Sequence, residues 1–370
     1  MTGLYIHIPY CHSKCAYCDF YSTPRRDSLD QLVSFLVKEW RMRRHELPES
    51  PSTLYLGGGT PSILSLEKLK ELIEGVGNKS WIESTIECNP EDVTLQWIDG
   101  VRALGFNRVS MGVQSLDDDQ LRFIGRRHTA HDALQKMEML LQNGFNVSVD
   151  LIYGLPHQSI DSWRRSLDGV LSLHPHHLSA YLLSYETGTR LWAMLQSNKL
   201  EEASDEAVHE MYQHLCAVTA SEGYEHYEVS NFAKTGSKAV HNSNYWNGSP
   251  YLGLGPGAHS FDGKIRRYNP SSIKQYLESI SHNMTPFVVD AEDDLERLND
   301  FIITRLRTNV GLQIEEITRG WGGELADAIL KDVRPHLTSG MLVREGDRLY
   351  IPQRQWLRSD AVMRDLIRVL

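Results

Sequence analysis

The sequence predicts an α/β fold, in which an open, partial (β/α)6 barrel is followed by a small, winged-helix-like α+β domain. Through about the first 220 residues, short β-rich runs alternate with amphipathic stretches, which is typical of a parallel sheet with right-handed crossovers. Six strand–helix units are too few to close an eight-fold barrel. Near residue 286 the pattern changes to helices that are followed by a hairpin.

Each unit of the barrel is assigned from its own pattern. The expected strands cover residues 4–9, 53–56, 84–88, 108–112, 147–153 and 178–183. The expected helices cover residues 28–46, 66–76, 95–104, 130–143, 160–173 and 205–222. Thr94 and Asp205 stand where N-caps are expected, and Gly105 and Gly144 follow helix ends.

The length of 370 residues fits one large domain and one small domain. We expect the barrel at residues 1–222, an irregular linking region rich in Gly, Asn, His and aromatic residues at 223–285, and the winged-helix-like domain at 286–370. In the last domain, helices are expected at 293–307, 314–319 and 324–336, and a hairpin at 341–351. Winged-helix modules often bind DNA, but the mixed charge of this one favours a structural or partner-facing role.

The composition excludes some classes of partner. The chain has 48 acidic and 38 basic residues and a net charge of -10, which argues against a general nucleic-acid or anionic-membrane surface. No apolar run reaches transmembrane length, and no charged and apolar leader precedes Tyr5. We therefore expect a soluble, cytoplasmic protein whose thiols stay reduced.

Three cysteines form a C-x3-C-x2-C run directly after the first expected strand: Cys11, Cys15 and Cys18. Three closely spaced thiolates suit a [4Fe-4S] cluster that leaves one iron without a protein ligand. A structural zinc site would need a fourth ligand, such as His12 or Cys88. A disulfide pair is the other alternative, but the cysteine count of 5 is odd. Cys88 and Cys216 are interpreted as core residues, not ligands.

Polar residues also lie at or just after the C-terminal ends of the other expected strands, where the chemistry of such folds lies. The run 57–61, Gly-Gly-Gly-Thr-Pro, can turn tightly and approach a ligand closely, and it is neither a Walker nor a Rossmann loop. Glu87, Gln114, Arg126 and Asp150 are candidates for holding a ribose and a carboxylate. Each alone would be an ordinary surface residue, but their shared position predicts a site.

These motifs together resemble radical S-adenosylmethionine (SAM) proteins, in the branch that holds oxygen-independent coproporphyrinogen III oxidase and the haem chaperone HemW. The resemblance rests on five segments in the order of the family: Tyr5-Ile6-His7-Ile8-Pro9 with the cysteine run, the Gly-Gly-Gly-Thr-Pro run, Glu87-Cys88-Asn89-Pro90, Ser110-Met111-Gly112-Val113-Gln114-Ser115 and Asp150-Leu151-Ile152-Tyr153-Gly154-Leu155-Pro156. It covers nearly the whole chain.

The resemblance implies that SAM chelates the open iron and that Gly58, Gly59 and Thr60 lie against its methionine part. Five residues match positions that contact SAM in the oxidase, which holds two such molecules: Tyr5, Glu87, Gln114, Arg126 and Asp150. The cofactor would carry the chemistry while the protein supplies position and field. The resemblance also implies an electron donor such as flavodoxin or ferredoxin.

Two departures argue against oxidase activity. Phe20 stands where the oxidase carries a further cysteine, and the chain begins almost at its first strand, where the oxidase has an extension. In contrast, His241-Asn242-Ser243-Asn244-Tyr245-Trp246 resembles the H-N-x-x-Y-W motif of HemW, whose histidine is implicated in haem binding. Neutral imidazole is a common haem ligand, although a lone histidine is more often a hydrogen-bonding turn residue. His226 and His259 are the fallback ligands.

The leading hypothesis is a haem chaperone that passes haem to an acceptor protein, for example a respiratory one, and that carries the cluster and SAM; whether it also acts as an enzyme is left open. The alternative is an oxygen-independent oxidase that converts coproporphyrinogen III to protoporphyrinogen IX. A third hypothesis is a nucleic-acid modifier that uses the C-terminal module. The resemblance also permits a dimer.

Overall fold

Six parallel strands form the centre of the fold. The structure is a computed structural model that describes residues 1–77 and 80–368. The central strands are β1 (Gly3–Ile8), β2 (Thr53–Gly58), β3 (Glu83–Cys88), β4 (Arg108–Gln114), β5 (Asn146–Tyr153) and β6 (His177–Leu182). They neighbour one another in chain order and pair in parallel. The prediction of six strand–helix units is confirmed.

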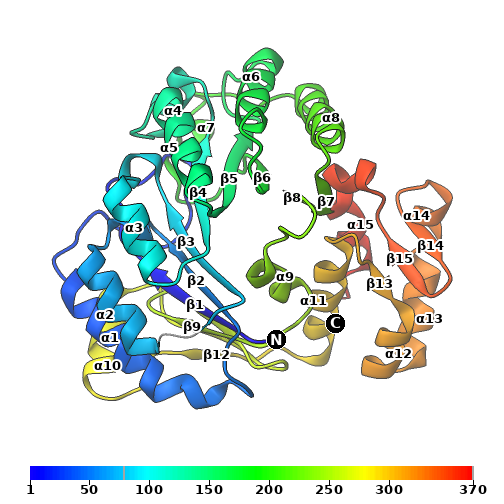
Figure 1. The fold of residues 1–370 in the computed structure, drawn as a ribbon. Coiled ribbons are helices and arrows are strands. Elements are labelled where there is room, and N and C mark those ends of the chain that lie inside the picture. The colour runs from blue at the N-terminus through cyan, green and yellow to red at the C-terminus, as the bar shows by residue number, and fades with distance from the viewer. Residues whose placement is uncertain (78–79, 369–370) are drawn as a thin grey trace.

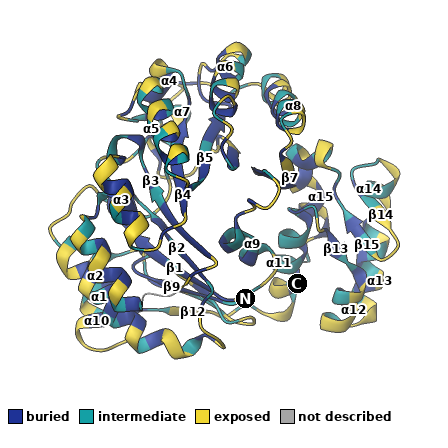
Figure 2. Ribbon diagram, in the orientation of Figure 1, coloured by how far each residue is buried: buried dark blue, intermediate teal, exposed yellow. Residues whose placement is uncertain are grey.

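Helices cover the outer face of this sheet (Figure 1). They are α1 (Leu29–Arg43), α2 (Leu66–Val76), α3 (Leu95–Ala103), α5 (Ala130–Gln142), α6 (Ile160–Leu171) and α8 (Asp205–Ser221), and two short helices, α4 (Asp118–Ile124) and α7 (Arg190–Gln196), were not expected. Each long helix buries one apolar stripe against the strands and exposes its other side (Figure 2). No described helix is long and apolar enough to cross a membrane.

The helix ends show which of the predicted caps are present in the structure. Thr94 caps α3 by accepting a hydrogen bond from the backbone N–H of Trp97, as expected. The prediction for α8 is wrong by one residue, because Ser204 accepts the bond from the Ala207 N–H and Asp205 is already helical. Gly105 and Gly144 have φ values of 89° and 74°, which explains glycine at these helix ends.

Residues 223–285 complete the sheet, contrary to the expectation of an irregular segment. They contain β7 (Glu225–Glu228), β8 (Asn231–Ala233), α9 (Val240–Trp246), β9 (Tyr251–Leu254), β10 (His259–Phe261), β11 (Arg266–Tyr268) and α10 (Ile273–Ser281). With β12 (Val288–Asp290), the strand order is β12-β11-β10-β9-β1-β2-β3-β4-β5-β6-β8-β7. The end strands do not pair with each other, so the barrel is open. Strands of three or four residues are too short to show a period in the sequence.

A buried ion pair on α1 contacts β9, because Arg43 Nη1 donates to the Gly253 carbonyl at 3.2 Å. Arg43 and Glu39 are fully buried, and the Arg43 Nη1 to Glu39 Oε1 distance is 2.7 Å. The other oxygen of Glu39 accepts hydrogen bonds from the Gly255 N–H at 2.8 Å and the Tyr276 hydroxyl at 2.7 Å. Gly255 has a φ of 96°, and a Cβ on it would lie 2.6 Å from the His7 carbonyl oxygen. The glycine-rich run near His259 is therefore a close-packed turn.

The C-terminal module has helices followed by a small sheet, as predicted. It comprises α11 (Asp294–Leu306), β13 (Leu312–Gln313), α12 (Ile314–Trp321), α13 (Gly323–Asp332), α14 (Arg334–Thr338), β14 (Val343–Glu345), β15 (Arg348–Tyr350) and α15 (Ser359–Leu366). The strands pair in the order β13-β15-β14. The helix expected at 324–336 is two helices, because Pro335 lies in the first turn of α14, where proline begins a new helix.

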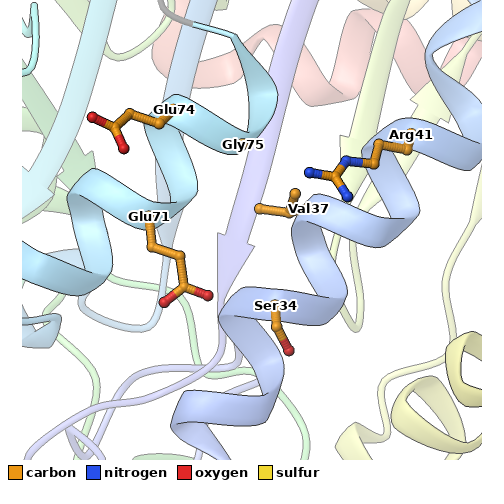
Figure 3. Close-up of a pocket in the computed structure, with 6 residues that line it drawn as sticks. All are labelled: Ser34, Val37, Arg41, Glu71, Glu74 and Gly75. Atoms are coloured by element: carbon orange, nitrogen blue, oxygen red, sulfur yellow. The ribbon is translucent and has the colours of Figure 1, made fainter.

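A groove of about 440 Å³ lies between α1 and α2 on the outer surface (Figure 3). Its lining residues are Ser34, Val37, Arg41, Glu71, Glu74 and Gly75. Gly75 allows the close contact of the two helices, because a Cβ there would collide with the Val37 side chain. The groove shares no lining residue with the cavity inside the barrel.

Candidate functional site

A cavity of about 420 Å³ lies inside the barrel. Alternate residues of the strands line it: Tyr55, Thr85, Glu87, Arg108, Ser110, Ser148, Asp150, Ser179 and Tyr181. The strand register places them on one face, since Tyr55 pairs with Thr85, Glu87 with Ser110, and Asp150 with Ser179. The intervening residues are apolar and buried under the outer helices, so the period of two separates a polar cavity from an apolar core.

The three cysteines of the loop after β1 all line this cavity. The Thr60 hydroxyl donates to Cys11 Sγ at 3.5 Å, and Arg126 Nη1 donates to Cys15 Sγ at 3.6 Å. Burial raises the pKa of the Cys11 thiol and raises that of Cys18 to about 11. Iron would therefore displace protons from these thiols when it binds.

This donor set fits a [4Fe-4S] cluster with three protein ligands. Thiolates are the usual ligands of such a cluster, and Gly59 leaves room beside them, since a Cβ there would lie 3.0 Å from Cys11 Sγ. A bound cluster would supply an open iron position and one electron. His12 does not face a zinc site, because its ring nitrogens contact Asp92 at 3.2 Å and Arg26 at 2.7 Å. In the described ranges, no three His, Cys, Asp or Glu side chains converge on one metal ion.

Glu87 forms part of the cavity wall beside the glycine run. Its carboxylate accepts hydrogen bonds from the Tyr55 hydroxyl at 2.8 Å and from the Gly58 N–H at 3.1 Å. Burial nevertheless raises the pKa of Glu87 to about 7. Gly58 has a φ of 110°, and a Cβ on it would meet the His7 ring, so only glycine fits here.

Gln114, the last residue of β4, and Arg126, which follows α4, both line the cavity. Arg126 Nη2 donates to Asn89 Oδ1 and to the Gly112 carbonyl, both at 2.6 Å. Its Nε is buried without a partner among the described residues. Gln114 has a φ of 69° at a β-bulge. Gly112 gives both side chains space, because a Cβ there would lie 2.9 Å from Gln114 Nε2.

Asp150 faces the same space from β5. Burial raises its pKa to about 6, while a hydrogen bond from Ser179 and the nearby charges of Arg108 and Arg126 act in the opposite direction. Glu87 and Asp150 are therefore two wall carboxyl groups that change charge near neutral pH. Tyr5 lies behind this wall: its hydroxyl contacts His7 Nδ1 at 2.9 Å, and it does not line the cavity.

His241 is buried on α9, with an exposed fraction of 1%. Its Nδ1 lies 2.9 Å from the Thr53 hydroxyl, and its Nε2 lies 2.9 Å from the Tyr245 hydroxyl. Thr53 begins β2, so His241 sits at the opposite strand ends from the cysteines. Burial lowers its pKa to about 3, which keeps the imidazole neutral. The next residue, Asn242, lines the cavity.

The other residues noted in the sequence have different surroundings. His226 is buried between the rings of Phe232 and Trp356, at centroid distances of 4.0 and 4.4 Å. His259 is exposed on β10. Phe20 is 64% exposed and lines the cavity, which places it at the mouth. Cys88 also lines the cavity, although it is almost fully buried.

Sequence reasoning missed Tyr55, Thr85, Arg108 and Asn242. All four line the cavity. The first three lie earlier in their strands, whereas the sequence-based candidates were sought at the C-terminal strand ends, where catalytic residues of such folds usually lie. The available signal was the recurrence of polar residues at every second position of β3, β4 and β5. Asn242 carried no such signal, because only the fold brings α9 to the barrel.

Comparisons with known proteins agree with this architecture. Residues 5–169 match the family model described as the radical SAM superfamily. The chain is 32% identical over 348 residues to the heme chaperone HemW of Bacillus subtilis, covering 90% of this chain and 91% of that protein. It is 37% identical to radical S-adenosyl methionine domain-containing protein 1, mitochondrial, of Bos taurus, covering 84% and 74%. A solved coproporphyrinogen III oxidase (HemN) from Escherichia coli has a TM-score of 0.86 at 24% identity, covering 100% of this chain and 90% of that chain.

Proposed function

Because this chain belongs to the radical SAM superfamily, in the family of proteins named heme chaperone HemW, we propose that it binds haem and passes it to an acceptor protein. The observation that carries this proposal is the placement of α9. The helix that bears the His-Asn-x-x-Tyr-Trp motif packs against the barrel, and its Asn242 lines the cavity that also contains the three cysteines. One residue of the proposed haem motif and the cysteine loop therefore line the same cavity.

We propose that Cys11, Cys15 and Cys18 hold a [4Fe-4S] cluster and that SAM binds its open iron. Gly58, Gly59 and Thr60 would contact the methionine part of SAM. Four further residues supply polar groups of suitable kind on the wall of the same cavity: Glu87, Gln114, Arg126 and Asp150. The unpartnered Nε of Arg126 is suited to a carboxylate. Tyr5 would act indirectly, by supporting Tyr55, whose ring centroid lies 6.0 Å away.

His241 is proposed as the haem ligand, and the structure imposes a condition on that role. Both ring nitrogens have hydrogen-bonding partners, Thr53 and Tyr245. Iron can bind Nε2 only after the contact with the Tyr245 hydroxyl is broken and α9 has moved. Haem loading would therefore release α9, at a cost of about one to two hydrogen bonds, on the order of 1–3 kcal/mol.

The test is an absorbance titration of haem into the full chain with its cluster reconstituted anaerobically. Wild type should bind one haem, and His241→Ala should weaken binding by about tenfold or more, because an axial ligand is lost. Tyr245→Phe should strengthen binding, because it frees Nε2. The matched control is His259→Ala, since His259 is exposed and lies on β10, outside α9. Unchanged binding in His241→Ala with weakened binding in His259→Ala would move the ligand to β10.

The alternative function is oxidation of coproporphyrinogen III to protoporphyrinogen IX. The resemblance of the fold to the solved oxidase favours it, as does the presence on one cavity wall of Glu87, Gln114, Arg126 and Asp150, the residues proposed to contact SAM. A turnover assay under anaerobic, reducing conditions separates the two functions. We expect no protoporphyrinogen IX from protein with a full cluster, and turnover without specific haem binding would identify an oxidase. Flavodoxin or ferredoxin is the proposed electron donor in either case.

A further inference from the structure

The deep part of the cavity contains a cation that the proposed cluster and SAM contacts do not use. Arg108 lines the cavity and is only 2% exposed. Its Nη1 donates to Asn146 Oδ1 at 2.9 Å and to the Ser237 carbonyl at 3.1 Å. Within residues 1–77 and 80–368 Arg108 forms no ion pair, although its charge acts to lower the pKa of Asp150. A buried guanidinium without a paired carboxylate is costly in free energy.

The neighbours of Arg108 supply further donors. Thr85, the register partner of Arg108 on β3, is fully buried, and its hydroxyl has no partner among the described residues. Ser110, Ser148 and Asn242 also line the cavity, although the Ser148 hydroxyl already contacts His177 Nδ1 at 2.7 Å. Unpartnered buried hydroxyl groups are rare in native proteins, and each one calls for an explanation. A guanidinium surrounded by hydroxyl and amide groups is the chemistry that receives a carboxylate.

We propose that this group, around Arg108 and Thr85, is a second carboxylate-binding subsite of the cavity, at the α9 end and separate from Arg126 beside the cysteines. The ligand is a molecule whose carboxylate reaches the deep end while its body lies toward the mouth. Two sources have this chemistry, namely a propionate of haem and the amino-acid carboxylate of a second SAM molecule, since the carboxylate of the first would be held at the open iron. The haem case rests on the proposed function, whereas the SAM case does not.

Thr85→Val and Arg108→Gln test the subsite in the full chain with its reconstituted cluster. Haem, haem dimethyl ester and SAM are titrated separately into wild type and both variants. Each variant should lower the affinity for the carboxylate ligand by about tenfold, because a hydrogen bond to a charged group is lost. Thr85→Val should leave the urea midpoint of unfolding equal or higher, because a methyl group replaces an unpartnered hydroxyl. Arg127→Gln is the control, since Arg127 is exposed and does not line the cavity.

The three ligands separate the outcomes. The subsite is assigned to a propionate if the variants bind haem weakly and wild type binds haem dimethyl ester just as weakly. Weakened SAM binding with unchanged haem binding assigns it to the amino-acid carboxylate. Unchanged binding of both ligands in both variants overturns the subsite, and so does a loss confined to an Arg108→Gln protein that is also less stable. Failure of wild type to bind haem would refute the proposed function alone, because the SAM titration still decides the subsite.

Discussion

At the scale of single residues, the cavity is defined by side chains whose partners are incomplete. Arg126 Nε and the Thr85 hydroxyl are buried without partners in the part of the chain that the structure describes. The two wall carboxyl groups, Glu87 and Asp150, have pKa values raised to about 7 and about 6 by burial. Such features cluster at binding sites. Burial also raises the pKa of the Cys11 and Cys18 thiols.

Cluster loss is the first prediction at this scale. Cys11→Ala, Cys15→Ala or Cys18→Ala should each reduce bound iron and sulfide to a small fraction of the wild-type amount, because two protein ligands do not hold such a cluster. Cys216→Ala should retain both, since Cys216 lies on α8 and does not line the cavity. Iron and sulfide analysis after anaerobic reconstitution measures the effect.

Cys88→Ala is the stricter comparison, because Cys88 lines the same cavity. Burial raises the pKa of this thiol well above 9, so we expect it to stay protonated and to leave the cluster intact. Normal iron content in Cys15→Ala, or loss of iron in Cys88→Ala, would contradict the ligand assignment.

At the scale of elements, α9 carries the proposed haem-binding motif and packs against β2. It has seven residues, which is too short for an isolated helix to be stable in water. Glu83 at the start of β3 holds its first turn, because its carboxylate accepts the N–H groups of His241 at 2.8 Å and Val240 at 2.9 Å. A carboxylate at a helix N-terminus also interacts favourably with the helix dipole. The position of His241 therefore depends on a residue far away in sequence.

Removing this cap should loosen α9 without disturbing the sheet. Glu83→Ala should speed hydrogen exchange of the backbone amides of residues 240–246 by roughly fivefold or more, matching a cap worth about 1 kcal/mol. Exchange in β4 and β5 should stay unchanged. Hydrogen-exchange mass spectrometry measures both, with Glu201→Ala as control because Glu201 is exposed in a loop. Equal protection of α9 in both variants would show that Glu83 does not hold the helix.

At the scale of the whole molecule, the C-terminal module is joined to the β7–β8 edge of the sheet. The backbone N–H of Val229 donates to the Arg307 carbonyl at 3.0 Å, and that of Asn309 donates to the Tyr227 carbonyl at 3.0 Å. Glu228 forms an isolated bridge with Thr308 and is only 2% exposed. Burial raises the pKa of Glu228 to about 7, against hydrogen bonds from Asn231 and Ser230.

Glu228 makes this junction sensitive to pH. Its pKa is about 7 in the folded protein and 4.5 in the unfolded chain, so the folded state binds the extra proton between these values. The stability contribution of the protonated form is fully present below about pH 4.5 and is lost as pH rises through 7, by roughly 3 kcal/mol. Glu228→Gln should therefore be more stable than wild type at pH 8.5 and similar to it near pH 4.5.

Urea unfolding at the two pH values measures this difference. Glu201→Gln is the matched control, because Glu201 is exposed, and it should show no pH-dependent gain. A Glu228→Gln protein that gains nothing at pH 8.5 would mean that the carboxylate is stabilised in the folded state by groups at the junction, such as Arg307.

The sequence alone determined the α/β class, the six parallel strands, the C-terminal helices with their hairpin, and the candidate residues around the cysteine run. These features are readable because strand–helix alternation, amphipathic period and ligand spacing are local properties of the chain. The C-terminal ends of parallel strands meet at one edge of the sheet, so the strand pattern by itself predicts that residues such as Glu87 and Asp150 lie close together.

Only the tertiary structure decided where His241 lies, which residues line the cavity, and how residues 223–285 add strands on both sides of the six central ones. The sequence places His241 in a region expected to be irregular, but it is a buried helix residue that contacts Thr53, Tyr245 and Glu83. Thr53 and Glu83 are 188 and 158 residues away from it in sequence. The physical reason is that burial and hydrogen-bond pairing between distant segments depend on packing, which no local pattern encodes.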